Sequence, residues 1–194
     1  MLDKKIDIFN AGRDLFYSKG YKETNISDIA EKAGIGVGTF YNYYPSKEKL
    51  FLEIFIKENE DQKRRMFETI DLNDDPVTLV TKIVTQNIDN INSNLIQKEW
   101  YNREIYEKLE KYFDEQGGMN SISELSYSGV SELIKRWKAD GKIRNDIDDE
   151  MIIAIFKSIP YIDVHKNEIG LQHFPQILFY ITEFIMKGLA DCPK

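Results

Sequence analysis

Residues 24–49, TNISDIAEKAGIGVGTFYNYYPSKEK, constrain the fold more than any other stretch of the sequence. The first part, residues 24–33, repeats apolar side chains at helical spacing and is followed by Gly34, which suits the left-handed residue after a helix. The second part, residues 37–44, is stopped by Pro45, which cannot continue a helix. Two short helices joined by so tight a turn predict a helix-turn-helix, whose second helix can enter a DNA major groove.

The composition of this stretch favours binding over packing alone. Thr24 and Ser27 are each expected to cap the first helix, because a side-chain oxygen there accepts from a free backbone N–H. Gly36 and Gly38 bare the backbone at the start of the second helix, although glycine costs helix stability. Polar side chains follow at Thr39, Tyr41, Asn42 and Tyr43. An ordinary pair of packed helices, with the tyrosines covering a small core, is the alternative that spacing leaves open.

A family resemblance extends this interpretation. The residues that carry it are Ile8, Phe9, Ala11, Leu15, Phe16, Gly20 and Tyr21, then Thr24, Ile26, Ile29, Ala30, Ala33 and Gly34, then Gly38, Thr39, Phe40, Tyr41, Tyr43 and Lys47 to Leu50. With this pattern, residues 8–55 resemble the N-terminal domain of the TetR family of bacterial transcriptional regulators. The departures are Tyr44, where Phe is more usual, and Gly36, where Ser is frequent. Losing that serine hydroxyl puts one polar DNA contact in doubt.

The resemblance implies an all-α fold of about nine helices. A three-helix head, residues 1–48, would bind DNA, and a larger helical domain, residues 49–194, would bind a ligand and form a dimer. The expected DNA-binding residues are Thr24, Ser27, Gly36, Val37, Gly38, Thr39, Tyr41, Asn42, Tyr43 and Lys47. Of these, Thr24, Ser27 and Lys47 are expected mainly to hold phosphates, which position a protein without specifying sequence.

The rest of the chain has the periodicity of helices throughout. Gly12, inside a predicted helix over residues 3–19, indicates a close crossing with another helix, or simply a weak point. Asp71–Pro76 and Gly117-Gly118 are the clearest breaks. The remaining helices are predicted at about residues 46–70, 76–92, 95–115, 120–139, 149–168 and 174–189.

The last two predicted helices, residues 149–168 and 174–189, are apolar over more than one stripe. A helix with one face on its own core needs a single stripe. A central position of these helices in the domain would explain a second apolar stripe. A four-helix homodimer interface would explain it as well, and the family resemblance favours that interface. A two-fold dimer places its recognition helices about 34 Å apart, or a multiple of that distance, on a palindromic site.

The middle of the chain is rich in aromatic residues, most of which would serve as core. A cavity lined by aromatic side chains with a few polar groups is nevertheless a good small-molecule site. The family resemblance implies an effector between the helices of the C-terminal domain, and we expect it to be small and apolar or amphipathic. The candidate lining residues are Trp100, Tyr127, Phe156 and Tyr161. Pro160 removes a helical hydrogen bond and is expected to kink the chain beside them.

Composition bounds the other classes of function. The net charge is −7, but residues 1–50 carry eight basic and seven acidic side chains, so a DNA-binding head remains possible. No apolar run approaches the ~18 residues of a transmembrane helix. Cys192 is the only cysteine, which suits a reducing cytoplasm. His165 and His173 are the only histidines, across Gly170 from each other, and we expect neither a metal site nor a cofactor.

The sequence therefore predicts a ligand-responsive transcriptional regulator, in the first instance a repressor, that an effector releases from DNA. The effector would act by preferring a form with splayed recognition helices, with a coupling of about 1–3 kcal/mol. An architectural DNA-binding protein without an effector is the main alternative. An all-α enzyme is the other, but the sequence contains no nucleophile elbow, zinc-protease motif or phosphate loop.

Overall fold

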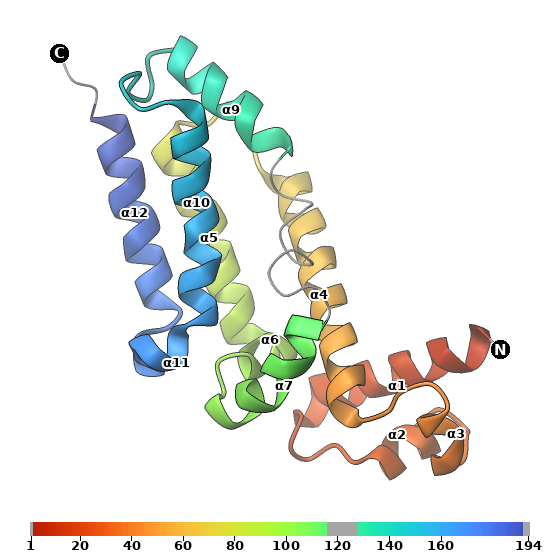
Figure 1. Cartoon of the computed structure of the whole chain (residues 1–194). Coiled ribbons are helices and arrows are strands. Elements are labelled where there is room, and N and C mark those ends of the chain that lie inside the picture. Colours follow the sequence, from red (N-terminus) through yellow and green to blue (C-terminus); the bar gives the residue numbers. More distant parts are fainter. Residues whose placement is uncertain (1, 116–127, 192–194) are drawn as a thin grey trace. The chain divides into compact units, whose positions relative to one another are not determined.

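The computed structural model describes residues 2–115 and 128–191, and within those ranges every regular element is helical. Eleven α-helices and one short 3-10 helix, η2, occupy these ranges (Figure 1). They are α1 (Leu2–Lys19), α2 (Ile26–Lys32), α3 (Val37–Tyr41), α4 (Lys47–Thr69), α5 (Pro76–Ser93), α6 (Leu95–Glu99), α7 (Arg103–Glu115), α9 (Ser128–Ala139), α10 (Asp149–Val164), α11 (Lys166–Ile169), η2 (Leu171–His173) and α12 (Gln176–Ala190). The expected all-α class is confirmed. Across these same ranges, a helix long and apolar enough to cross a membrane is absent.

The helices belong to two compact units. The first is built from the described residues of 1–63 and 90–121, and the second from those of 64–89 and 122–194. The first unit therefore holds α1–α3, most of α4, and also α6 and α7. The division at residue 48 remains a prediction. In the structure, α6 and α7 belong to the same compact unit as the head.

The core of the first unit lies where α1 crosses α4. Phe16 and Phe51 are fully buried, and their rings meet edge to face with centroids 5.0 Å apart. A Cβ atom at Gly12 would lie only 2.7 Å from Leu50 Cδ2 and 3.3 Å from Ile54 Cδ1. The close crossing predicted at Gly12 is confirmed, because only a residue without a side chain lets α4 approach α1 this closely.

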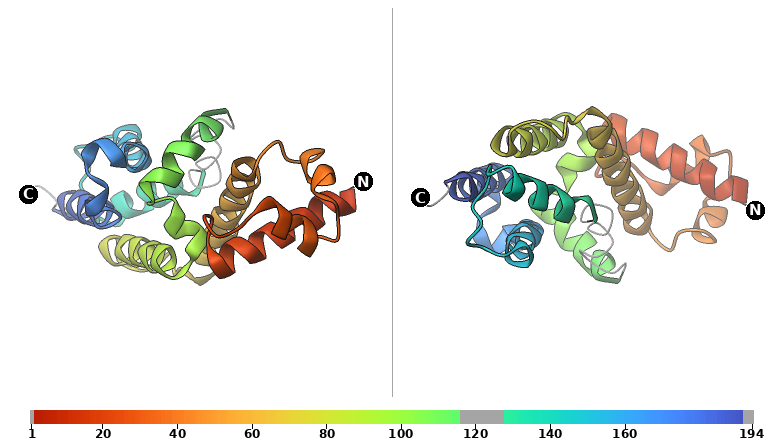
Figure 2. Two further views of the ribbon diagram at one scale, coloured as in Figure 1. Left: turned by 90° about the horizontal axis from the view of Figure 1, so that it is seen from below. Right: turned by 90° about the horizontal axis from the view of Figure 1, so that it is seen from above.

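The second unit is built around α9, α10 and α12. Its buried residues are Leu79, Ile134, Trp137, Ile143, Ile152, Met186 and Leu189. α10 and α12, the two long blue helices, lie side by side (Figures 1 and 2). α10 continues through Pro160 as one helix. The core is thus made by one stripe of each long helix, and other stripes, which carry Met151 and Tyr161 on α10 and Tyr180 and Phe184 on α12, are exposed among the described residues.

Two predicted helices are divided in the structure. The helix expected over residues 95–115 is α6 and α7, separated at Trp100–Asn102, where Trp100 stacks on Phe55 with ring centroids 4.8 Å apart. The helix expected over residues 149–168 is α10 and α11, because the chain leaves helical geometry at His165. Of the helix expected over residues 120–139, only α9 is described. The Gly117-Gly118 break and Cys192 lie outside the described residues.

Polar residues fix several helix starts in the second unit. Asp75 Oδ1 accepts from the amides of Val77 and Thr78, at 3.0 and 3.2 Å, just before α5. Asp148 Oδ1 accepts from Met151 N at 2.7 Å and caps α10. The helix starts predicted at about residues 76 and 149 are both confirmed.

Candidate nucleic-acid interface

The turn between α2 and α3 has the geometry of a Schellman motif. Gly34 has a φ of 65°, and its N–H donates to Glu31 O at 3.0 Å. The N–H of Ile35 reaches back to Ala30 O at 2.9 Å. These two bonds satisfy carbonyls that the end of a helix otherwise leaves free. The predicted role of Gly34 is confirmed, and the motif turns the chain sharply from α2 into α3.

The predicted caps of α2 are wrong. Its N-cap is Asn25, whose N–H donates to Asp28 Oδ2 at 3.5 Å. Thr24 lies one residue earlier, where its hydroxyl donates to Gly20 O at 2.7 Å, and Ser27 is already inside the first turn. The Thr24 side chain thus closes the turn that follows α1. The sequence pattern of α2 alone does not reveal this hydrogen bond.

α3 packs by one buried side chain and exposes the opposite face. Phe40 is fully buried and lies against Tyr44, with ring centroids 5.9 Å apart. Val37 and Tyr41, four residues apart on the same face, are 43% and 53% exposed, and Asn42 beside them is exposed as well. The side chains of Val37, Tyr41 and Asn42 are therefore available to a partner molecule.

The backbone at the start of α3 is open. A Cβ atom placed at Gly36 or Gly38 would have no described atom within 4 Å apart from its chain neighbours and its own helix. Packing among the described residues therefore does not require glycine at either position. Close approach of another molecule to the backbone would explain why both positions are glycine.

Thr24 and Lys47 hold the head together from within. The Thr24 side chain is 0% exposed, so the expectation that its hydroxyl contacts a phosphate is corrected. Lys47 Nζ donates to Tyr21 O and to Thr24 O, each at 2.8 Å, and lies 4.0 Å from the centre of the Tyr21 ring. Burial lowers the pKa of the Lys47 ammonium. Lys47 therefore joins the first turn of α4 to the loop before α2, and at most one of its N–H groups is left for a phosphate.

Sequence reasoning missed the polar group around Tyr21. Its hydroxyl donates to Glu48 Oε1 at 2.5 Å, and its backbone N–H donates to Glu99 Oε1 at 3.1 Å. Burial and the Glu48 hydrogen bond raise the pKa of the Tyr21 hydroxyl. Burial would raise the pKa of the Glu48 carboxyl, but hydrogen bonding, chiefly from Tyr21, brings it below its ordinary value. The partners lie 27 and 78 residues away from Tyr21, so no local pattern announces them.

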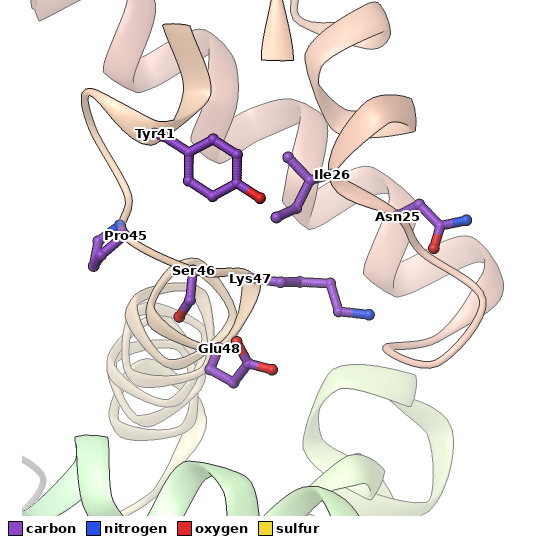
Figure 3. A pocket seen from close by; sticks show the side chains of 7 residues that line it. All are labelled: Asn25, Ile26, Tyr41, Pro45, Ser46, Lys47 and Glu48. Atoms are coloured by element: carbon purple, nitrogen blue, oxygen red, sulfur yellow. The ribbon is translucent and has the colours of Figure 1, made fainter. Parts of the chain in front are cut away.

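A hollow of about 420 Å³ lies beside the exposed face of α3. Its lining comes from the start of α2, the end of α3 and the start of α4, and comprises Asn25, Ile26, Tyr41, Pro45, Ser46, Lys47 and Glu48 (Figure 3). Tyr41 and Ile26 point toward each other across it, and the stem of Lys47 runs along one wall. The helix-turn-helix and the first turn of α4 thus share one continuous surface.

Four exposed lysines of the first compact unit are paired with carboxylates. The pairs are Lys5–Glu53 at 3.0 Å, Lys19–Asp28 at 2.6 Å, Lys22–Glu104 at 2.5 Å and Lys32–Asp14 at 3.3 Å. Exposed ion pairs contribute little stability, so a phosphate can replace the carboxylate at small cost. The hydrogen bond from Lys19 lowers the pKa of the Asp28 carboxyl. The head therefore exposes cations on and just after α1 and on α2, and neutral polar groups on α3.

The other expected DNA-binding residues lie on or next to this surface. Ser27 is exposed on α2, and Thr39 and Tyr43 are partly exposed at α3 and just after it. With Val37, Tyr41, Asn42 and the two glycines, they form one neighbourhood, and their contact with DNA stays a prediction.

The described candidate ligand residues divide between the two compact units. Trp100 is buried in the first unit between Phe55 and Tyr106, with ring centroids at 4.8 and 4.9 Å. Phe156 packs on the core of the second unit, whereas Tyr161 is 55% exposed. Tyr127 lies outside the described residues. Their role in effector binding stays a prediction.

The fold of the head defines the class of the protein. A short exposed helix, fixed by a buried aromatic and joined to α2 by a glycine turn, makes this a helix-turn-helix protein of the kind that reads DNA. The family model for bacterial regulatory proteins, tetR family, matches residues 8–54. The head of the chain, residues 8–54, is therefore similar to that of the TetR family.

Comparison with individual proteins extends the similarity beyond the head. The uncharacterized HTH-type transcriptional regulator YuxN of Bacillus subtilis (strain 168) is 30% identical over 59% of this chain and 38% of its own length. The chain spans less than two fifths of the first two curated relatives that it matches. The HTH-type transcriptional repressor KstR2 of Rhodococcus jostii (strain RHA1) is 24% identical over 83% of this chain and 78% of its own.

A solved structure shows the same fold. The structure of RolR in complex with its ligand resorcinol superposes with a TM-score of 0.61, covering 96% of this chain and 87% of RolR at 15% sequence identity. At that identity the similarity concerns the fold alone, and it includes the helices that follow the head.

Proposed function

We propose that this protein is a ligand-responsive transcriptional repressor that binds a palindromic DNA operator as a homodimer in the cytoplasm and is released by a small-molecule effector. The observation that carries the proposal is the exposed face of α3. Val37, Tyr41 and Asn42 point away from the head while Phe40 fixes the helix to it. The match of residues 8–54 to the family model for bacterial regulatory proteins, tetR family, and the repressor activity named for KstR2, support the same conclusion.

Uncovered aromatic residues on α12 and α10 support the homodimer. Phe184 and Tyr180 are 65% and 54% exposed, and their rings stack with centroids 6.3 Å apart. Met151 and Tyr161 are also exposed, on a stripe of α10. Burying such side chains against a second copy of the chain contributes about 1.5–3 kcal/mol for each one fully covered. Two helices from each copy would form the four-helix interface.

α6 supports the response to an effector. This five-residue helix carries Glu99, which accepts the Tyr21 N–H of the head, and it is followed at once by Trp100 in the aromatic cluster with Phe55 and Tyr106. Gln97, on the same helix, is buried, and its Nε2 has no hydrogen-bond partner within the described ranges. A buried amide of this kind needs an acceptor.

An apolar or amphipathic effector with an acceptor for Gln97 fits these features. RolR, which has a similar fold, was solved in complex with a ligand, resorcinol. In our proposal, an effector that displaces Trp100 moves α6, and the Glu99 bond then carries the movement to the turn after α1.

Selection of bound duplexes from a random library by the full chain tests the proposal. We expect an inverted repeat, and sedimentation of the free protein as a dimer at micromolar concentration. Phe184→Glu should give monomers and lose binding to the selected duplex, because it places a charge in the interface.

Leu72→Glu is the matched control, since Leu72 is an exposed apolar residue outside α10 and α12 and its substitution should leave both measurements unchanged. Enrichment of no duplex at all, or a wild-type monomer that binds a single half-site, would reject the proposal.

A further inference from the structure

The recognition surface is unusual in its lack of charge. Residues 35–46, IGVGTFYNYYPS, contain no acidic or basic side chain and no histidine. The basic residues that flank them lie outside α3: Lys32 ends α2, and Lys47 begins α4, where it donates to two carbonyls of the head. A protein that reads guanine in the major groove commonly does so with an Arg or Lys fork on its O6 and N7 atoms. α3 offers no such group.

The groups that α3 does expose match the other base pair. Asn42 is exposed at its end, and an asparagine amide fits the N6 donor and N7 acceptor of adenine. Val37 is exposed at its start, where an apolar side chain can cover the C5 methyl group of thymine. Tyr41, one helical turn after Val37 and next to Asn42, brings a hydroxyl that can bond to either base. The two open glycines allow the backbone to approach without a steric barrier.

We infer that the recognition helix reads A·T base pairs, with Asn42 on an adenine and Val37 on a thymine methyl group, so that the centre of each half-site is A·T-rich. This inference rests on the proposed function and adds the chemistry of the operator to it. Phosphate contacts at the rim would supply affinity for any duplex, while the neutral face of α3 would supply the discrimination.

The test uses a duplex selected by the full-length protein and base analogues placed in it one at a time. Uracil in place of thymine removes only the methyl group, and 7-deazaadenine in place of adenine removes only the N7 acceptor. For the wild-type protein we expect one thymine whose replacement weakens binding about three- to five-fold, the value of one buried methyl. We also expect one adenine whose replacement weakens it about five-fold or more.

Two variants assign the contacts. With Val37→Ala the thymine-to-uracil penalty should disappear at that one position, and with Asn42→Ala the 7-deazaadenine penalty should disappear at its position. Asn92→Ala, at an exposed asparagine of α5, is the matched control and should keep both penalties. All titrations are made at one salt concentration, because the phosphate contribution depends on it.

The outcomes separate this inference from the proposed function. If no duplex is enriched, the proposed function fails and the inference fails with it. If a duplex is enriched and bound by the dimer, but its half-site centre requires G·C pairs, the regulator stands and the inference is overturned. The inference is also overturned if Val37→Ala and Asn42→Ala weaken binding to the unmodified duplex and to every analogue duplex by the same factor, because neither variant then abolishes the penalty of one analogue.

Discussion

Replacement of Lys47 by methionine separates two roles for this lysine, a contact with phosphate and a link within the head. Methionine keeps the apolar stem and removes two hydrogen bonds to Tyr21 O and Thr24 O, each 2.8 Å long. A hydrogen bond from a charged group contributes about 1.5–3 kcal/mol net. Because the side chain is only partly buried and water can reach the freed carbonyls, we expect a loss of about 2 kcal/mol for the pair. For a chain of this size that lowers the melting temperature by about 4–8 °C.

The assay is urea unfolding followed by circular dichroism, together with the salt dependence of DNA binding. Lys32→Met is the control, since Lys32 makes an exposed ion pair with Asp14 whose loss costs less than about 1 kcal/mol. If Lys47→Met is as stable as the wild type, and the slope of log affinity against log salt falls by about 0.9, the link within the head is refuted and Lys47 is a phosphate ligand.

Two further predictions concern Tyr21. The pKa of Glu48 is lowered, so Glu48 stabilises the fold above its ordinary pKa of 4.5, and this stabilisation is lost on acidification. The pKa of Tyr21 is raised, so Tyr21 stabilises the fold below its ordinary pKa of 10.0, and this stabilisation is lost as the pH rises above that pKa. Tyr21→Phe should therefore lower the unfolding free energy most between about pH 5 and 9 and less on either side, and a difference independent of pH, measured by urea unfolding, would contradict the assignment. Glu99→Ala removes the acceptor of the Tyr21 N–H, so hydrogen exchange of that amide should become about ten-fold faster, and an unchanged rate would show that the Glu99 bond does not hold the turn.

Much of the fold follows from local chemistry in the sequence. Gly34 after α2 and Asp148 before α10 act through residues within a few positions of themselves, so their roles can be predicted from spacing. Gly12 is predictable because a glycine inside an amphipathic helix needs a packing reason, and Leu50 provides it.

The site is less predictable because its contacts are distant in sequence. Lys47 has the spacing of a phosphate ligand, and only the approach of the turn after α1, 23–26 residues away, shows that its ammonium is used inside the head. Thr24 resembles a cap but bonds backward to Gly20, so Asn25 takes its place. The helix break after α6 accompanies the packing of Trp100 on Phe55, which periodicity does not contain.

The central claim is that the exposed face of α3 lies in the major groove of the operator. Photo-crosslinking tests it without changing the protein: 5-iodouracil, substituted for thymine in a selected duplex, places iodine at the major-groove edge, where it reacts with aromatic side chains in contact. The account predicts that the cross-linked peptide, identified by mass spectrometry, contains Tyr41 or Tyr43. Cross-links that map outside residues 24–49, from a duplex bound with the affinity of the unmodified one, would contradict it.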